Sequence, residues 1–164
     1  MMEQDLHKHL EYASGYLDLK MYEDAVREAD EVLAADPNHM QAIAIKAAIY
    51  WQTNQLQQAE PYVAALAERN PKEAGIWVNL AYIRRRTRSL DAAAETLQRA
   101  LEADPRDALA HFNLACYRAV QHRVPEALAL LKDAFQLDPR LKKLAPAEED
   151  FKTLRDLPEF QEMM

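Results

Sequence analysis

The stretch Ala93–Pro105 reads AAETLQRALEADP and contains the pattern that decides the fold. Ala93, Leu97 and Ala100 recur every three or four residues, which is the spacing of one face of an α-helix. Pro105 follows an aspartate, and a proline disfavours helical geometry in the residue before it, so the helix is expected to end there. The local unit is therefore an amphipathic helix closed by an Asp-Pro step.

The same step returns at a fixed interval along the chain. Prolines that follow Asp or Asn stand 34 residues apart, at Pro37, Pro71, Pro105 and Pro139. With each proline at position 32 of a 34-residue unit, positions 8 and 20 are alanine in every unit. These alanines are Ala13, Ala47, Ala81, Ala115, Ala25, Ala59, Ala93 and Ala127. Antiparallel helices need a small residue where their axes come closest, so the alanines are expected at helix crossings.

Each unit predicts two amphipathic helices. They are expected at residues 6–19, 22–35, 40–53, 56–69, 74–87, 90–103, 108–121 and 124–137. The four units are 6–39, 40–73, 74–107 and 108–141, with a lead-in at 1–5 and capping helices at 140–164. The chain has only 2 glycines, which disfavours a β-rich fold. The expected fold is all-α, a right-handed superhelical α-solenoid of antiparallel helix pairs.

This pattern resembles the tetratricopeptide repeat, which has large, small, aromatic and proline residues at set positions. The third unit matches it with Trp77, Leu80, Ala81, Ala93, Leu97, Ala100 and Pro105. Two departures stand out: alanine replaces the usual glycine at position 8, and Lys46 stands where leucine is usual. The resemblance covers residues 6–141 and implies a scaffold for protein–protein interaction.

The end of the chain is expected to cap the stack. A helix continues over 141–145, a second short helix opens at Ala147, and Pro158 starts a last turn. Phe151, Leu154 and Phe160 are interpreted as a hydrophobic plug on the helix at 124–137. The acids at 148–150 are interpreted as a solvated helix start. The run from 150 to 160 resembles endings of bacterial tetratricopeptide proteins. The alternative is a docking tail.

The resemblance also implies where a ligand would bind. In this family the first helix of each pair lines the concave face of the stack. The predicted ligand-binding residues on that face are Leu17, Ala48, Trp51, Val78, Asn79, Tyr82, Arg85, Arg86, Phe112, Asn113 and Cys116. Exposed apolar groups rimmed by polar ones are typical of binding sites. The alternative is that these side chains pack between neighbouring repeats.

One subclass of the family grips the C-terminal carboxylate of a partner with Lys and Asn, but Leu10 and Ser14 occupy those positions here. That clamp is therefore not predicted. Charge suggests a further alternative, since the first unit has eight acidic against three basic residues and the third has six basic against five acidic. Head-to-tail self-association of the chain into homo-oligomers would bring these units together.

Composition and motifs argue against several function classes. A net charge of −7 disfavours a nucleic-acid partner. No leader sequence and no long uncharged apolar run is seen, so membrane insertion is not expected and a cytoplasmic location is. No metal-ligand spacing, nucleophile pattern or phosphate loop occurs, so we expect neither an enzyme nor a cofactor or metal site.

The leading hypothesis is a scaffold that binds a peptide or protein segment in the concave groove. Two alternatives stay open. One is a secretion-type chaperone that shields an apolar cargo segment, and the other is a self-assembling structural protein.

Overall fold

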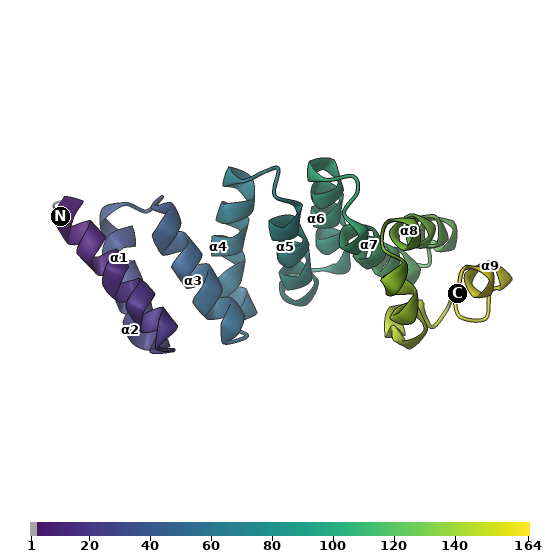
Figure 1. Cartoon of the computed structure of the whole chain (residues 1–164), viewed down its shortest axis with the longest axis horizontal. Coiled ribbons are helices and arrows are strands. Elements are labelled where there is room, and N and C mark those ends of the chain that lie inside the picture. The colour runs from purple at the N-terminus through teal and green to yellow at the C-terminus, as the bar shows by residue number, and fades with distance from the viewer. Residues whose placement is uncertain (1–2) are drawn as a thin grey trace. The chain divides into compact units, whose positions relative to one another are not determined.

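The computed structural model describes residues 3–164, which contain helices and turns but no strand (Figure 1). Eight long helices occupy the predicted places. Their bounds are α1 (Glu3–Asp18), α2 (Tyr22–Ala35), α3 (Met40–Gln52), α4 (Leu56–Arg69), α5 (Ala74–Thr87), α6 (Leu90–Ala103), α7 (Ala108–Val120) and α8 (Val124–Leu137). The all-α prediction is confirmed, although α1 begins at Glu3, inside the expected lead-in. No helix of residues 3–164 has both the length and the apolar composition to cross a bilayer.

The Asp-Pro steps end the helices as expected. Asp36, Asp104 and Asp138 follow α2, α6 and α8 with extended backbone, at φ of −135°, −138° and −138°. A proline imposes this geometry on the residue before it. The Oδ1 atom of each aspartate accepts a hydrogen bond from the backbone N–H two residues later, at 2.9 to 3.0 Å. Proline therefore sets the bend and the aspartate closes the turn.

Alanines bring the paired helices close together. All eight alanines of positions 8 and 20 are buried, with at most 5% of any of them exposed. Helices α1 and α2 pack together, as do α3 with α4, α5 with α6, and α7 with α8. Successive pairs are joined by packing of α2 on α3 and of α6 on α7. This arrangement is an all-α solenoid of helix pairs.

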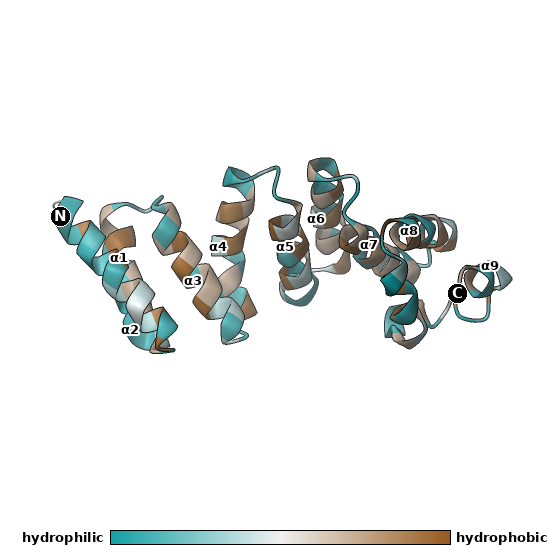
Figure 2. Ribbon diagram, viewed as in Figure 1, coloured by the Kyte–Doolittle hydropathy of each residue, from teal (hydrophilic) through white to brown (hydrophobic). Residues whose placement is uncertain are grey.

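The described chain divides into two compact parts, each with two of the 34-residue repeats, and we call these parts the first and the second unit. The first ends at Asn70 and contains α1 to α4, and the second begins at Pro71. Each has its own buried core, with Val32 and Ile49 in the first and Leu97 and Leu131 in the second. Figure 2 shows hydrophobic and hydrophilic residues on different sides of the helices in both units.

The residues after α8 form short 3₁₀ turns where the sequence predicts helices, and this corrects the prediction. They are η1 (Pro139–Lys143), η2 (Ala145–Ala147) and η3 (Glu149–Phe151). Backbone bonds that span three residues close them, such as Leu144 N–H to Leu141 O at 3.0 Å. Prolines interrupt any longer helix, because they have no N–H to donate. The last turn predicted from Pro158 is confirmed as α9 (Pro158–Met163).

The hydrophobic plug is buried but is only partly where the sequence places it. Phe151, Leu154 and Phe160 are at most 3% exposed. Turn η1 and helix α9 pack on α8, whereas η3 packs on α7. Phe151 contacts Phe112 of α7 edge-to-face, with ring centroids 5.4 Å apart. The short turns reverse the chain, which brings η3 back to the first helix of the last pair.

Candidate functional site

The predicted site residues of the first unit differ in exposure. Leu17 is half-buried and packs against the core of that unit. Ala48 is also half-buried, whereas Trp51 remains 39% exposed near the end of α3. Of these three residues, Trp51 is therefore the one with a large exposed side chain.

A hollow of about 710 Å³ opens between the beginnings of α1 and α3 in the first unit. It is lined by Glu3, Gln4, Leu6, His7, Leu10, His39 and Gln41. Nδ1 of His39 is buried there and makes no hydrogen bond to any of residues 3–164. His7, Leu10 and Gln41 occupy positions that the resemblance assigns to the concave face, although Leu10 is only 5% exposed and belongs to the core.

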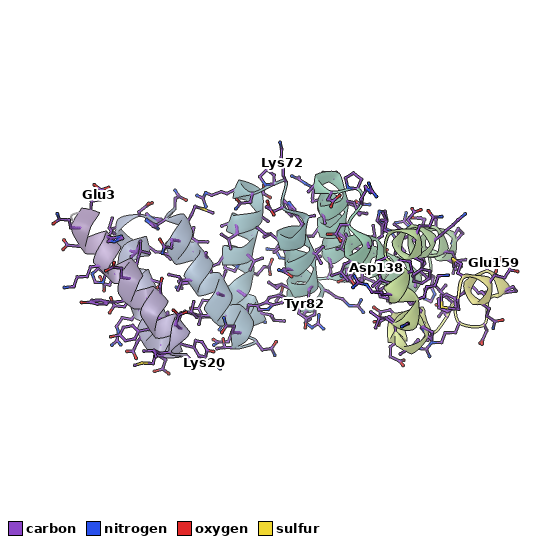
Figure 3. All side chains as sticks on the ribbon, in the orientation of Figure 1. Glu3, Lys20, Lys72, Tyr82, Asp138 and Glu159 are labelled. Carbon is purple, nitrogen blue, oxygen red and sulfur yellow. The ribbon has the colours of Figure 1, made fainter. Side chains whose placement is uncertain are left out.

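Helix α5 of the second unit presents a polar and aromatic surface. Asn79 and Arg86 are exposed, and Tyr82 is 39% exposed and projects from the helix (Figure 3). The guanidinium carbon of Arg86 lies 3.7 Å from the centroid of the Tyr82 ring, a cation–π contact. Val78 is 7% exposed and belongs to the core. We call Asn79, Tyr82 and Arg86 the α5 surface.

Arg85 lies on a different side of α5 and is paired within the chain. Its Nη1 and Nη2 donate to the two carboxylate oxygens of Asp150 at 2.5 and 2.8 Å. Its guanidinium carbon also lies 4.8 Å from the centroid of the Tyr117 ring. The hydrogen bonds that Arg85 donates to Asp150 raise the pKa of Arg85 above its ordinary value. A fork of two parallel bonds is the strongest and most orientation-specific way to hold a carboxylate.

Phe112 and Cys116 of α7 are covered by the end of the chain. Phe112 is 5% exposed and contacts Phe151, and Cys116 is 4% exposed beside Glu148 and Asp150. The sequence places both side chains on an open face, whereas the structure buries them because Glu148–Phe151 folds back on α7. Asn113 is half-buried. The apolar patch expected on the concave face therefore does not include Val78 and Phe112, because both side chains are buried.

Cys116, Glu148 and Asp150 bring their ligand atoms within 4.8 Å of one another, which is close enough for a metal ion. Two features oppose that use. Arg85 donates to both oxygens of Asp150 and so competes with any cation. Burial, with the nearby carboxylates of Glu148 and Asp150, raises the pKa of the Cys116 thiol, which keeps it protonated. Only the thiolate is a good metal ligand.

Sequence reasoning missed the partners of Arg85. Asp150 was expected in a solvated helix start, but its side chain is 18% exposed and fully engaged with Arg85. Tyr117 was assigned no role and packs under the same guanidinium. Opposite charge on the two residues is the available signal, yet they are 65 positions apart and local periodicity does not relate them.

Solved structures with the same fold share little sequence with this chain. A crystal structure of MamA superposes with a TM-score of 0.79 at 18% identity, covering 99% of this chain and 91% of that one. YrrB, described as a tetratricopeptide protein with an unusual peptide-binding site, gives 0.75 at 18% identity over 94% and 80%. MamA from Desulfovibrio magneticus gives 0.69 at 22% identity over 84% and 78%.

A comparison with curated protein sequences finds no match to this chain. A sequence model of the tetratricopeptide repeat, however, matches residues 13–74, 46–108 and 78–141 in overlapping segments. Together they span residues 13–141, from the second half of α1 to the middle of η1. The chain therefore belongs to the tetratricopeptide repeat family.

Proposed function

We propose that this chain binds a segment of another protein, with the α5 surface of Asn79, Tyr82 and Arg86 at the centre of the contact. The repeat fold is typical of protein–protein interaction, and members of this family are generally scaffolds without enzymatic activity. The observation that supports this location is the exposed pair of Tyr82 and Arg86, stacked at 3.7 Å. Tyr and Arg are enriched among the residues that dominate binding energy at interfaces.

The chemistry of the α5 surface suits a polar peptide. Arg86 offers a guanidinium to a carboxylate, and Tyr82 offers a flat ring to an apolar side chain. Asn79 has both a donor and an acceptor, so it can pair with the backbone of an extended segment. YrrB is described as having an unusual peptide-binding site, which is consistent with peptide recognition on this fold.

The alternative of a chaperone for an apolar cargo has less support. It needs a continuous apolar groove, and Val78 and Phe112 are 7% and 5% exposed. The exposed aromatic residues of the predicted site, Trp51 and Tyr82, are accompanied by polar neighbours such as Gln52 and Arg86. A mixed surface of this kind favours a peptide with charged and polar side chains.

Selection from a displayed library of random peptides on the immobilised protein tests the proposal. Enriched peptides are then titrated by fluorescence polarisation. Tyr82→Ala is expected to weaken their binding about 10- to 30-fold, the usual loss at an interface hot spot. Asn113→Ala, on the first helix of the next pair, is expected to weaken it less because its side chain is half-buried.

Tyr12→Ala is the matched control. Tyr12 is 46% exposed and also lies beside a cation, Lys8, but it is outside the predicted face. Its substitution should change affinity by less than about twofold. If the library yields no peptide, or if the peptides bind Tyr82→Ala as tightly as the original protein, the α5 surface is not the site.

A further inference from the structure

The second unit holds a segment of its own chain on the face that the repeat fold uses for ligands. Asp150 engages Arg85 of α5, and the next residue, Phe151, engages Phe112 of α7. Phe151 is fully buried, and its ring also lies 6.1 Å from that of Phe160. Two neighbouring residues thus contact two different helices: Asp150 contacts α5 through its charge, and Phe151 contacts α7 through its aromatic ring.

The contacts define what kind of segment fits. The guanidinium of Arg85 lies over the Tyr117 ring and points two N–H groups at one carboxylate, so a neutral side chain at that place would leave the donors unpaired. Phe112 presents a ring to the edge or face of another ring, which favours an aromatic neighbour. Glu148 adds a second acid nearby. The fitting chemistry is a short acidic stretch followed directly by an aromatic residue.

The local structure of Glu148–Phe151 allows this segment to dissociate from α5 and α7. It consists of 3₁₀ turns, whose hydrogen bonds are local and poorer than those of an α-helix. Besides the two bonds from Arg85 to Asp150, it is held by Arg155, whose Nη2 donates to the carbonyl of Glu148 at 3.0 Å and lies 3.6 Å from a carboxylate oxygen of Glu149. Short elements without a regular ladder open more readily than packed helices.

We infer that the Arg85–Phe112 face is a recognition site for an acidic–aromatic segment of a partner protein, and that Glu148–Phe151 occupies it until that partner displaces it. This deepens the proposed function and rests on it. The partner recognised has the chemistry of the displaced segment, a carboxylate followed by an aromatic ring. Arg86 of the α5 surface is the next residue along α5 after Arg85, about 100° around the helix.

Cys116 provides a built-in reporter, because it is the single cysteine of the chain and lies buried beside Glu148 and Asp150. The experiment measures how fast dithionitrobenzoate labels Cys116 in the full chain. In the double variant Asp150→Asn with Phe151→Ala, labelling is expected to be at least about tenfold faster, because the covering segment opens. Circular dichroism checks that the helices remain.

A synthetic peptide of residues 146–157, PAEEDFKTLRDL, is then added to the double variant. It is expected to slow labelling about fivefold or more at millimolar concentration, the range of weak peptide binding. The control peptide PAEENAKTLRDL, which has neither the carboxylate nor the ring, should not protect. Adding Arg85→Gln to the double variant should abolish protection by the first peptide, whereas adding Arg88→Gln, a neighbouring arginine, should not.

Four outcomes overturn the inference. Unchanged labelling in the double variant means that the segment does not cover the face. Loss of helical signal means that it is an integral part of the fold. Fast labelling without protection means that the site takes no segment from another molecule. A dimer in light scattering assigns the site to the tail of a second copy. None of these outcomes depends on Tyr82, so the library selection is judged separately.

Discussion

The two units place different chemistry at the same position of the repeat. Lys46 of α3 occupies position 7 in the first unit, where Leu80 and Leu114 stand in the second. All three are buried, at 6%, 0% and 4% exposed. Nζ of Lys46 donates to Oδ1 of Asp30 at 2.5 Å and lies 4.8 Å from the centroid of the Tyr62 ring. Position 7 is therefore buried in three of the four repeats, whereas Tyr12 at the same position of the first repeat is 46% exposed. Where the position is buried, neighbouring helices decide whether a charge is tolerated.

The pKa of Lys46 reflects this balance. Burial alone would lower it, but the hydrogen bonds and charges of Asp30 and Tyr62 outweigh burial and raise it above the ordinary value. The first unit thus stabilises a buried ammonium with a carboxylate from α2 and an aromatic ring from α4. The residue that corresponds to Asp30 in the second unit is Gln98, also 16 positions before its partner, Leu114. Glutamine has no charge to offer.

Transferring the lysine to the second unit should give the largest effect. Leu114→Lys is expected to lower the free energy of unfolding by about 3 to 5 kcal/mol, because it places an ammonium in a buried site where Gln98 stands in place of the carboxylate. Urea unfolding followed by circular dichroism measures the loss.

Adding Gln98→Asp should restore about 1 to 2 kcal/mol by recreating the pair that Asp30 makes, and a double-mutant cycle isolates this coupling. Gln98→Asp alone, at an exposed position of α6, should change stability by less than about 0.5 kcal/mol. A loss below about 1 kcal/mol for Leu114→Lys would show that the second unit accommodates the charge without a partner, and the contrast between the units would disappear.

The reverse substitution should have a smaller effect of opposite sign. Lys46→Leu is expected to raise stability by about 1 kcal/mol, because replacing a buried ion pair by an apolar side chain is often neutral or stabilising. The side chain of Asp30 is 53% exposed, so it stays hydrated after its partner is removed. Thermal unfolding at low and at high salt measures the change. Lys72→Leu, at an exposed position, controls for the loss of a positive charge. Destabilisation by Lys46→Leu would mean that its ion pair contributes net stability.

The fold could be predicted because its determinants are local and repeated. Each Asp-Pro step ends a helix through its own backbone, and each alanine of positions 8 and 20 is set by the spacing of two adjacent helices. These features need no knowledge of distant residues. The prediction therefore gives the helices closely wherever the 34-residue pattern continues. It is wrong for the short turns after Pro139, where the pattern stops, and correct again for the last turn from Pro158.

From the sequence, the site could be predicted only as a set of residues on one face of the first helix of each pair. Arg85 and Arg86 are neighbours, and the resemblance to the family gave them the same role. Successive residues point about 100° apart on a helix, so one contacts Asp150 and the other stacks on Tyr82. Which part of the face stays open depends on the path of residues 140–157, where short turns reverse the chain. Such a path is set by contacts distant in sequence, which no local pattern contains.

The loops inside the helix pairs differ between the units as well. Position 15 is Lys20 and Asn54 in the first unit, at φ of 58° and 56°, and His122 in the second, at 58°. In each case the next residue donates its N–H to the carbonyl five positions back, as Met21 does to Tyr16 at 2.8 Å. This left-handed cap is a common helix ending. Arg88 is the exception, with φ of −127°, and Ser89 caps α6 by accepting from Ala92 N–H at 3.1 Å.

Glycine substitutions at position 15 should distinguish these two kinds of loop. Their effects on the free energy of unfolding should be smaller than those of the lysine substitutions. Lys20→Gly is expected to raise the free energy of unfolding by about 0.5 to 1 kcal/mol, because a left-handed backbone strains a residue with a Cβ atom. Asn54→Gly should gain less, since asparagine tolerates this conformation. Arg88→Gly should lose about 0.5 kcal/mol, because its φ is negative and glycine adds freedom only to the unfolded chain. Urea midpoints of the three variants measure the order, and a gain for Arg88→Gly equal to that for Lys20→Gly would show that the α5–α6 loop uses the same left-handed cap.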